Sequence, residues 1–141
     1  PIREDQLDLN QSPYELYQGV GWMNRYLEQL ALAYYKEYGL QIGTIRTANI
    51  YGPYDRFDDQ VSHVIPALIK RALCKENPFV VWGDGRTVRD FVYVEDLVEG
   101  VLMVLNENCT ADPINISNGT PVSIKDLVDV VLDICDHHVS P

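Results

Sequence analysis

Two arginines, Arg86 and Arg89, follow a glycine-containing turn at Gly83–Gly85 and are the side chains best suited to bind an anion. A guanidinium is planar and permanently charged, and it can donate two parallel hydrogen bonds to a phosphate. Arg89 lies between this turn and the apolar residues that follow, so elements on both sides can fix its position. The alternative is a structural ion pair of Arg89 with Asp84 or Asp90. Both interpretations stay open from the residues alone.

Asn49 is the second candidate because it follows an expected strand and opens a loop over residues 49–59 rich in glycine, proline, tyrosine and aspartate. Ligands bind at loops beyond the carboxyl ends of parallel strands in open α/β sheets. A side-chain amide both donates and accepts hydrogen bonds, which suits a sugar hydroxyl or a phosphate. The alternative is an Asx-turn that only holds the loop together.

The elements that would position these side chains alternate between helix and strand. Apolar spacing predicts helices over 14–38, 62–75 and 94–106 and from Ser123, and strands over 41–48, 79–82, 88–93 and 113–117. Gly39 is a stop signal for the first helix, and Ser62 and Ser123 are expected helix caps. This alternation favours an α/β fold.

Composition excludes several classes of function. The net charge of −10 over 141 residues argues against a nucleic-acid-binding surface, which needs a broad positive footprint. Three widely separated cysteines and three scattered or terminal histidines predict no metal site and no disulfide framework. The sequence shows no signal peptide and no apolar run of the roughly 18 residues that a membrane span requires. We therefore expect a cytoplasmic protein without membrane contact.

Four motifs occur in a fixed order: Arg46–Pro53 (RTANIYGP), His63–Ile69 (HVIPALI), Gly83–Leu97 (GDGRTVRDFVYVEDL) and Asn115–Gly119 (NISNG). Together they resemble the extended short-chain dehydrogenase/reductase family, the NAD(P)-dependent epimerases and dehydratases of nucleotide sugars. The resemblance covers most of the chain. It implies the C-terminal part of a Rossmann-type parallel sheet with a small substrate-binding α/β subdomain, because the family's glycine-rich cofactor turn does not occur in this sequence.

The resemblance also implies roles for single residues. Arg89 would hold the diphosphate of a nucleotide-diphosphate sugar, and Asn49 would contact its sugar end. Further substrate contacts are expected at His63, Val64, Val80 and Trp82, and contacts with the cofactor, NAD or NADP, at Asn24 and Ala48. For Trp82 core packing is the alternative to stacking on the base, and for His63 a plain helix-end role is the alternative.

The sequence departs from the family at its catalytic pair, a tyrosine followed four residues later by a lysine. None of the nine tyrosines has a lysine at that spacing. Matching by the segment GWMNRYLEQL places Val20 and Asn24 at the two positions, and neither can act as the base or the cation. Tyr17 could substitute only if the Gly19–Gly21 segment bends it inward; otherwise it is a packing residue.

Two functions therefore stay open. The first is the substrate-binding portion of an NAD(P)-dependent nucleotide-sugar epimerase or dehydratase, inactive as this chain alone. The second is a non-catalytic nucleotide-sugar-binding homologue that has lost the pair at Val20 and Asn24. In either case we expect residues 1–61 (arm, long helix and strand) and 94–122 to belong to the Rossmann-type domain. Residues 62–93 and the last helix, 123–141, are expected to form the substrate subdomain, and the long N-terminal helix to form a homodimer.

Overall fold

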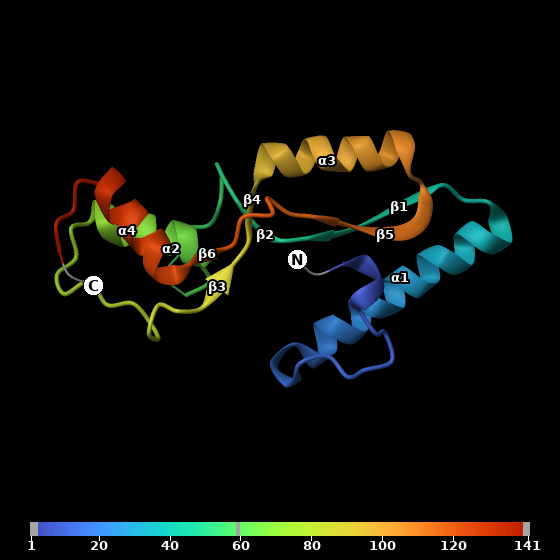
Figure 1. The fold of residues 1–141 in the computed structure, drawn as a ribbon, viewed down its shortest axis with the longest axis horizontal. Coiled ribbons are helices and arrows are strands. Elements are labelled where there is room, and N and C mark those ends of the chain that lie inside the picture. Colours follow the sequence, from blue (N-terminus) through green and yellow to red (C-terminus); the bar gives the residue numbers. More distant parts are fainter. Residues whose placement is uncertain (1–2, 59, 140–141) are drawn as a thin grey trace. The chain divides into compact units, whose positions relative to one another are not determined.

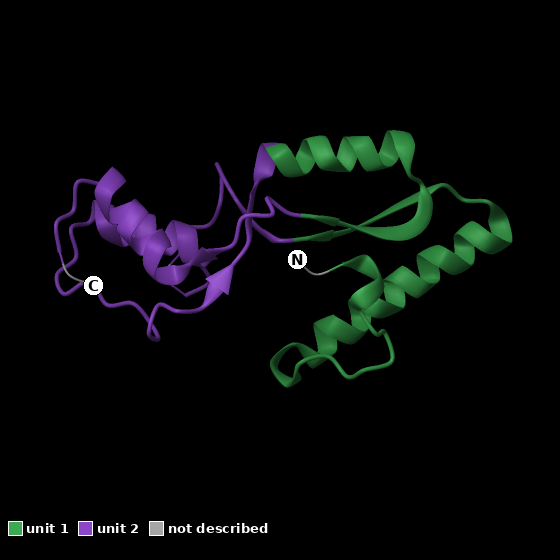
Figure 2. Ribbon diagram, viewed as in Figure 1, with its two compact units in different colours: residues 1–47, 96–116 green, residues 48–95, 117–141 purple. Residues whose placement is uncertain are grey.

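The computed structural model describes residues 3–58 and 60–139. The chain forms two compact units, unit 1 (residues 1–47 and 96–116) and unit 2 (residues 48–95 and 117–141), which are coloured separately in Figure 2. Both units combine helices with strands, as the α/β prediction requires. The assignment of sequence ranges to a cofactor domain and a substrate subdomain stays a prediction.

Unit 1 is built on two parallel strands, β1 (Ile42–Thr47) and β5 (Thr110–Ile116). Helices α1 (Gln18–Tyr38) and α3 (Val94–Glu107) lie on opposite sides of these strands in Figure 1. Two short 3-10 turns, η1 (Glu4–Gln6) and η2 (Glu15–Tyr17), precede α1. Close approach of α3 to the strands depends on glycine, since a Cβ at Gly43 would lie 2.9 Å from a methyl carbon of Val104.

Unit 2 contains β2 (Asn49–Tyr51), α2 (Val64–Leu73), β3 (Val88–Arg89), β4 (Phe91–Tyr93), β6 (Val122–Ser123) and α4 (Ile124–Ile134). Strand β2 pairs in parallel with β4, and β3 pairs antiparallel with β6. Helices α2 and α4 pack together through a buried apolar cluster of Leu68, Ala72, Phe79, Val128, Val131 and Leu132. This cluster is the core between the two helices of unit 2.

Two of the expected helix signals are confirmed and one is wrong. Gly39 ends α1 in the left-handed conformation, φ 66°, and the Ser123 hydroxyl accepts a hydrogen bond from the Asp126 amide at 3.0 Å. Ser62 does not cap α2, which begins at Val64 with His63 as its N-cap residue. The Ser62 hydroxyl instead donates to the carbonyl of Arg56 at 2.8 Å, so it holds the preceding loop.

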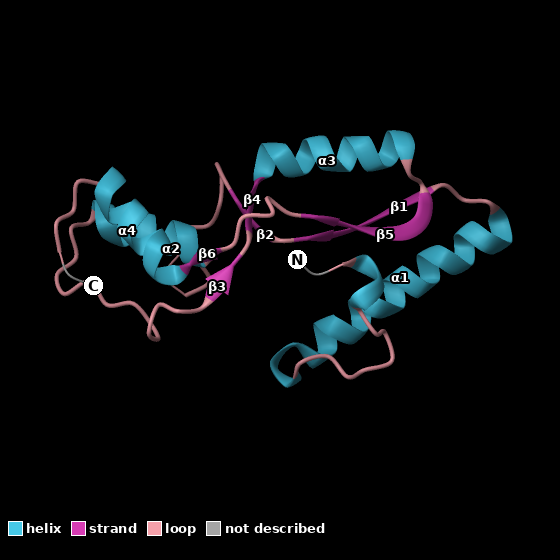
Figure 3. Cartoon of the chain, in the orientation of Figure 1, coloured by secondary structure: helices cyan, strands magenta, loops and turns pink. Residues whose placement is uncertain are grey.

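Three strand predictions need correction. Asn49–Tyr51 is strand rather than loop, because it pairs with Phe91–Tyr93. The predicted strand over 88–93 is divided at Asp90 into β3 and β4, which pair with different partners. Residues 79–82 form no strand and lie in the long loop between α2 and β3 (Figure 3). There Phe79 is buried beneath the guanidinium of Arg71, which donates to the Val80 carbonyl at 2.6 Å and takes the place of a strand partner.

Candidate functional site

Asn49 lies at the start of β2, and its amide bridges to the junction of β3 and β4. The side-chain nitrogen donates to the Asp90 carbonyl at 2.9 Å, and the Asn49 backbone amide donates to the same oxygen at 3.1 Å. This bond reaches a different strand, whereas an Asx-turn would close within the loop of Asn49 itself. It fixes the side chain while the amide oxygen stays available as an acceptor.

Asp90, which the sequence suggested only as an ion-pair partner of Arg89, anchors the segments around Asn49. Its carboxylate accepts the backbone amides of Asn118 at 3.1 Å and Gly119 at 3.0 Å. The carboxylate therefore joins the β3–β4 junction to the loop after β5, and its carbonyl holds Asn49. Gly119, the last residue of the Asn115–Gly119 motif, adopts a positive φ of 74° where its amide meets this acceptor.

Arg89 is exposed on β3 beside this junction. Its guanidinium makes one hydrogen bond, to the carbonyl of Val88 at 3.3 Å. Asp84 lies 3.7 Å from the guanidinium of Arg86 instead. Among the residues that the structure describes, no carboxylate lies within 4.0 Å of the Arg89 guanidinium nitrogens, so the ion-pair alternative is not realised and this cation is open to an anionic ligand.

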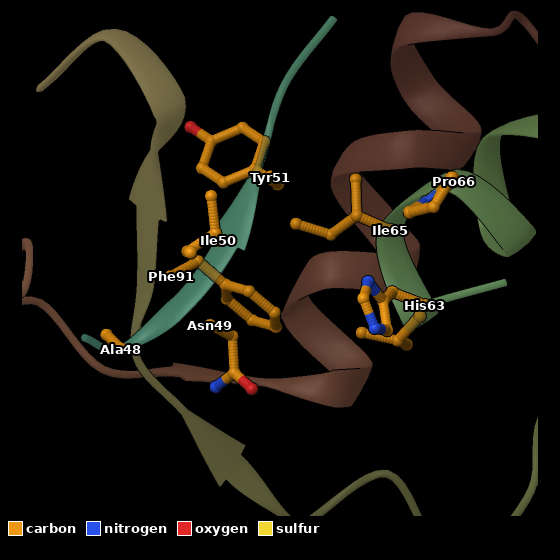
Figure 4. A pocket seen from close by; sticks show the side chains of 9 residues that line it. Ala48, Asn49, Ile50, Tyr51, His63, Ile65, Pro66 and Phe91 are labelled. Atoms are coloured by element: carbon orange, nitrogen blue, oxygen red, sulfur yellow. The ribbon is translucent and has the colours of Figure 1, made fainter. Parts of the chain in front are cut away.

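A cavity of about 300 Å³ lies between β2 and the start of α2. Figure 4 shows Asn49 and Phe91 on the strand side and His63 and Ile65 on the helix side. Of the predicted substrate and cofactor residues, Ala48, Asn49, His63 and Val64 line this cavity, whereas Val80, Trp82 and Arg89 do not. The structure thus gathers half of the candidates from separate sequence motifs around one hollow.

Val80 and Trp82 lie in the loop that precedes the glycine turn. The Trp82 side chain is 95% exposed and Val80 is 53% exposed. Core packing of Trp82 is therefore excluded in this chain. An indole that is held in solvent by the loop offers a flat apolar face for stacking.

The remaining candidates lie on or before α1 in unit 1. Tyr17 precedes a regular helix that already includes Gly19 and Gly21, so no bend turns it inward, and its ring contacts Tyr14 with 6.3 Å between centroids. Val20 and Tyr17 are both more than half exposed. Seven residues along a helix correspond to about 10 Å, so Tyr17 and Asn24 are two turns apart.

Asn24 lines a hollow of about 520 Å³ in unit 1, together with Glu28 and Arg46. Arg46 binds Glu28 through two hydrogen bonds of 2.7 and 2.8 Å. This bond to the carboxylate raises the pKa of Arg46 above its ordinary value. The pair connects α1 to β1, and the sequence analysis named Arg46 only as the first residue of a motif.

The described part of the chain holds no group of three or more metal-ligating side chains and no helix long and apolar enough to cross a bilayer.

Comparison with known proteins extends these observations. The model of the NAD dependent epimerase/dehydratase family matches residues 4–117. GDP-L-fucose synthase of Sinorhizobium fredii is 36% identical over 107 residues, which cover 73% of this chain and 34% of that protein. The chain thus spans about a third of the length of this relative.

Two solved structures agree with the fold. UDP-glucose 4-epimerase of Thermotoga maritima with UDP-glucose has a TM-score of 0.77 at 27% identity, over 88% of this chain and 38% of that chain. GDP-mannoheptose C4 reductase of Campylobacter jejuni with NADP bound has a TM-score of 0.84 at 20% identity, over 97% and 52%. The chain belongs to the NAD-dependent epimerase/dehydratase family of extended short-chain dehydrogenases/reductases and has their Rossmann-type α/β fold.

Proposed function

We propose that this chain is the substrate-binding C-terminal portion of a nucleotide-sugar epimerase or dehydratase, with Arg89 at the diphosphate and Asn49 at the sugar end. The observation that carries the proposal is the Asn49–Asp90 hydrogen bond of 2.9 Å. Through this bond the Asn49 amide lies next to Asp90, which directly follows Arg89, and all three residues belong to unit 2. A guanidinium open to solvent and a fixed amide from adjoining strands suit a ligand with a charged centre and a hydroxyl-rich end.

The other substrate contacts follow from the same arrangement. His63 and Val64 line the cavity of Asn49 from the helix side. Trp82, with Val80 beside it, presents an exposed indole in the loop before β3 and is proposed to stack on the nucleotide base. The relatives' names include both GDP and UDP sugars.

The cofactor is proposed to be NAD or NADP, since the family is NAD dependent and solved structures of similar fold hold NADP or NAD. The residues present fit its chemistry poorly. The positions of the family's base and cation hold Val20, which is 57% exposed, and Asn24, which carries no charge. Asn24 and Ala48 could contribute hydrogen bonding and shape, so we assign them to cofactor binding and derive no proton or hydride transfer from this chain.

A non-catalytic nucleotide-sugar-binding protein is the second candidate. The regular course of α1 from Gln18, which leaves Tyr17 exposed and two turns from Asn24, favours it. Cofactor absorbance in the full-length protein separates the two candidates. Nucleotide-sugar binding with a transient change in nicotinamide absorbance identifies the enzyme, and binding without it identifies the binder.

A homodimer through α1 is proposed for the full-length protein. This helix has no buried residue in the chain and exposes large apolar side chains at Val20, Met23, Tyr26, Leu27 and Tyr34. Analytical ultracentrifugation of the full-length protein tests it, and a monomer at micromolar concentration would contradict it. The cytoplasm stays our predicted location, because all three cysteines are free thiols.

Isothermal titration of the full-length protein with UDP-glucose and GDP-mannose tests the proposed function. We expect at least one of them to bind far more tightly than its nucleoside, uridine or guanosine, because the diphosphate and sugar contacts are missing from the nucleosides. Equal affinity for sugar nucleotide and nucleoside, or no binding of either, would reject the proposal.

A further inference from the structure

Asp55 contacts His63, the residue that precedes α2 and lines the cavity of Asn49. The Oδ1 atom of Asp55 lies 3.7 Å from Nδ1 of His63. The Asp55 side chain is 18% exposed and that of His63 is 78% exposed. A largely covered carboxylate therefore faces one nitrogen of an imidazole whose remaining surface is open to solvent.

His63 lies between two hollows of unit 2. It lines the cavity of about 300 Å³ together with Asn49, and it lines a second cavity of about 270 Å³ together with Asp55. Asp55 is absent from the lining of the first cavity, and Asn49 is absent from that of the second. Ile50 and Tyr51 also line both cavities, and the imidazole of His63 is the shared side chain with an ion-pair contact to Asp55.

The loop that carries Asp55 is fastened to the helix that begins after His63. The Asp55 carboxylate accepts the Arg56 amide at 2.7 Å. Ser62 donates to the Arg56 carbonyl at 2.8 Å, and the Lys70 ammonium donates to the Phe57 carbonyl at 3.1 Å. The first bond fixes one oxygen of the carboxylate, and the other two hold the backbone that follows Asp55.

The two ring nitrogens of histidine take different roles when one of them faces a carboxylate. A carboxylate only accepts, so it favours the tautomer with the proton on Nδ1, and Nε2 of the neutral ring is then an acceptor. A separation of 3.7 Å is longer than a hydrogen bond. Such contacts are often long without ligand and shorten when it binds.

We propose that Asp55 is a positioning residue of the sugar end of this site, which orients His63 so that Nε2 accepts a hydrogen bond from a sugar hydroxyl. This inference rests on the proposed function, because it needs a sugar beside Asn49. It concerns binding and assigns no proton transfer. Arg89 does not line either cavity, so the contribution of Asp55 is separate from that of the diphosphate contact.

Isothermal titration of the full-length protein with UDP-glucose, GDP-mannose, UDP and GDP tests the role. Asp55→Asn is expected to weaken binding of the preferred sugar nucleotide about tenfold, the size of one lost hydrogen bond, and to leave the matching diphosphate unchanged. Asp55→Glu should restore most of the affinity. Asp58→Asn, in the same loop and with the same charge change, is the matched control and should bind like the wild type.

A double-mutant cycle isolates the action through His63. In a His63→Ala protein, Asp55→Asn should cause no further loss. Three results would overturn the inference. The first is a loss of affinity from Asp55→Asn that is just as large in the His63→Ala protein. The others are an equal loss of affinity for UDP and UDP-glucose, and a loss from Asp58→Asn equal to that from Asp55→Asn. Circular dichroism melting verifies that each variant is folded. Wild-type protein that binds diphosphate but gains nothing from the sugar would overturn it too, and absence of all binding would reject the proposed function itself.

Discussion

At the residue scale, Asp90 organises the candidate site. Its carbonyl accepts Asn49, and its carboxylate accepts the amides of Asn118 and Gly119. The sequence predicted Arg89 and Asn49 as candidates because their side chains have the right chemistry. It could not predict the bonds of Asp90, because a carboxylate beside an arginine also suits an ion pair, and only tertiary structure brings the amides of residues 118 and 119 to it.

Asp90→Ala is therefore expected to lower the free energy of unfolding by about 1–3 kcal/mol, since two backbone amides lose a charged acceptor. Urea unfolding of the full-length protein measures the loss. Hydrogen exchange at the amides of Asn118 and Gly119 should accelerate. Asp129→Ala, which removes an exposed carboxylate from α4, is the control. Unchanged exchange at both amides in Asp90→Ala would show that the anchor has no energetic role.

At the scale of elements, sequence signals succeeded where one local bond decides a boundary. Gly39 and Ser123 carry such bonds within their own helices. Signals failed where a distant partner decides. The apolar run Phe79–Trp82 has strand-forming residues, yet Arg71 from α2 donates to the Val80 carbonyl and Trp82 is exposed to solvent. Ser62 likewise bonds back to its own loop.

The 3-10 turn η1 is fastened to β5 by Glu4, and this contact gives a pH-dependent prediction. The Glu4 carboxylate accepts the Asn115 amide at 2.9 Å, and this hydrogen bond lowers the pKa of Glu4 below its ordinary value of 4.5. A lowered pKa means that the charged form stabilises the folded state. The stabilisation is fully present above pH 4.5 and is lost as the pH falls through the folded pKa.

Glu4→Gln should accordingly flatten the dependence of unfolding free energy on pH below 4.5. Urea titrations of wild-type and variant protein at several acidic pH values measure it. Glu15→Gln is a suitable control, because Glu15 is exposed and lies in the other 3-10 turn. Parallel pH profiles for wild type and Glu4→Gln would contradict the role of this contact.

At the scale of the molecule, motif order predicted the family and the α/β fold, and the comparisons confirm both. The chain spans about a third of the length of the curated relatives it matches, and unit 1 bears exposed apolar surface on both helices. On α3 the exposed large apolar residues are Val98, Leu102, Met103 and Leu105. The broad apolar content of the helices indicated such a surface from the sequence. It could not indicate which of these residues remain exposed to solvent in this chain.

The isolated chain of 141 residues is therefore expected to self-associate or to be of marginal stability. Size-exclusion chromatography with light scattering measures association, and binding of a fluorescent hydrophobic dye measures exposed apolar surface. The full-length protein at equal concentration is the control for dye binding, and it should bind less dye per chain. A monomeric isolated chain with a sharp unfolding transition at high temperature would refute this expectation.

The central claim is that Arg89 binds a diphosphate, and titration of UDP and GDP into full-length Arg89→Ala tests it most directly. Arg86→Ala is the matched control, since Arg86 carries the same charge, lies three residues before Arg89 and already faces Asp84. We expect Arg89→Ala to weaken binding of the preferred diphosphate at least tenfold, as loss of a charge-assisted contact does, while Arg86→Ala changes it little. Equal affinities in wild type and Arg89→Ala, or equal losses in both variants, would contradict the claim.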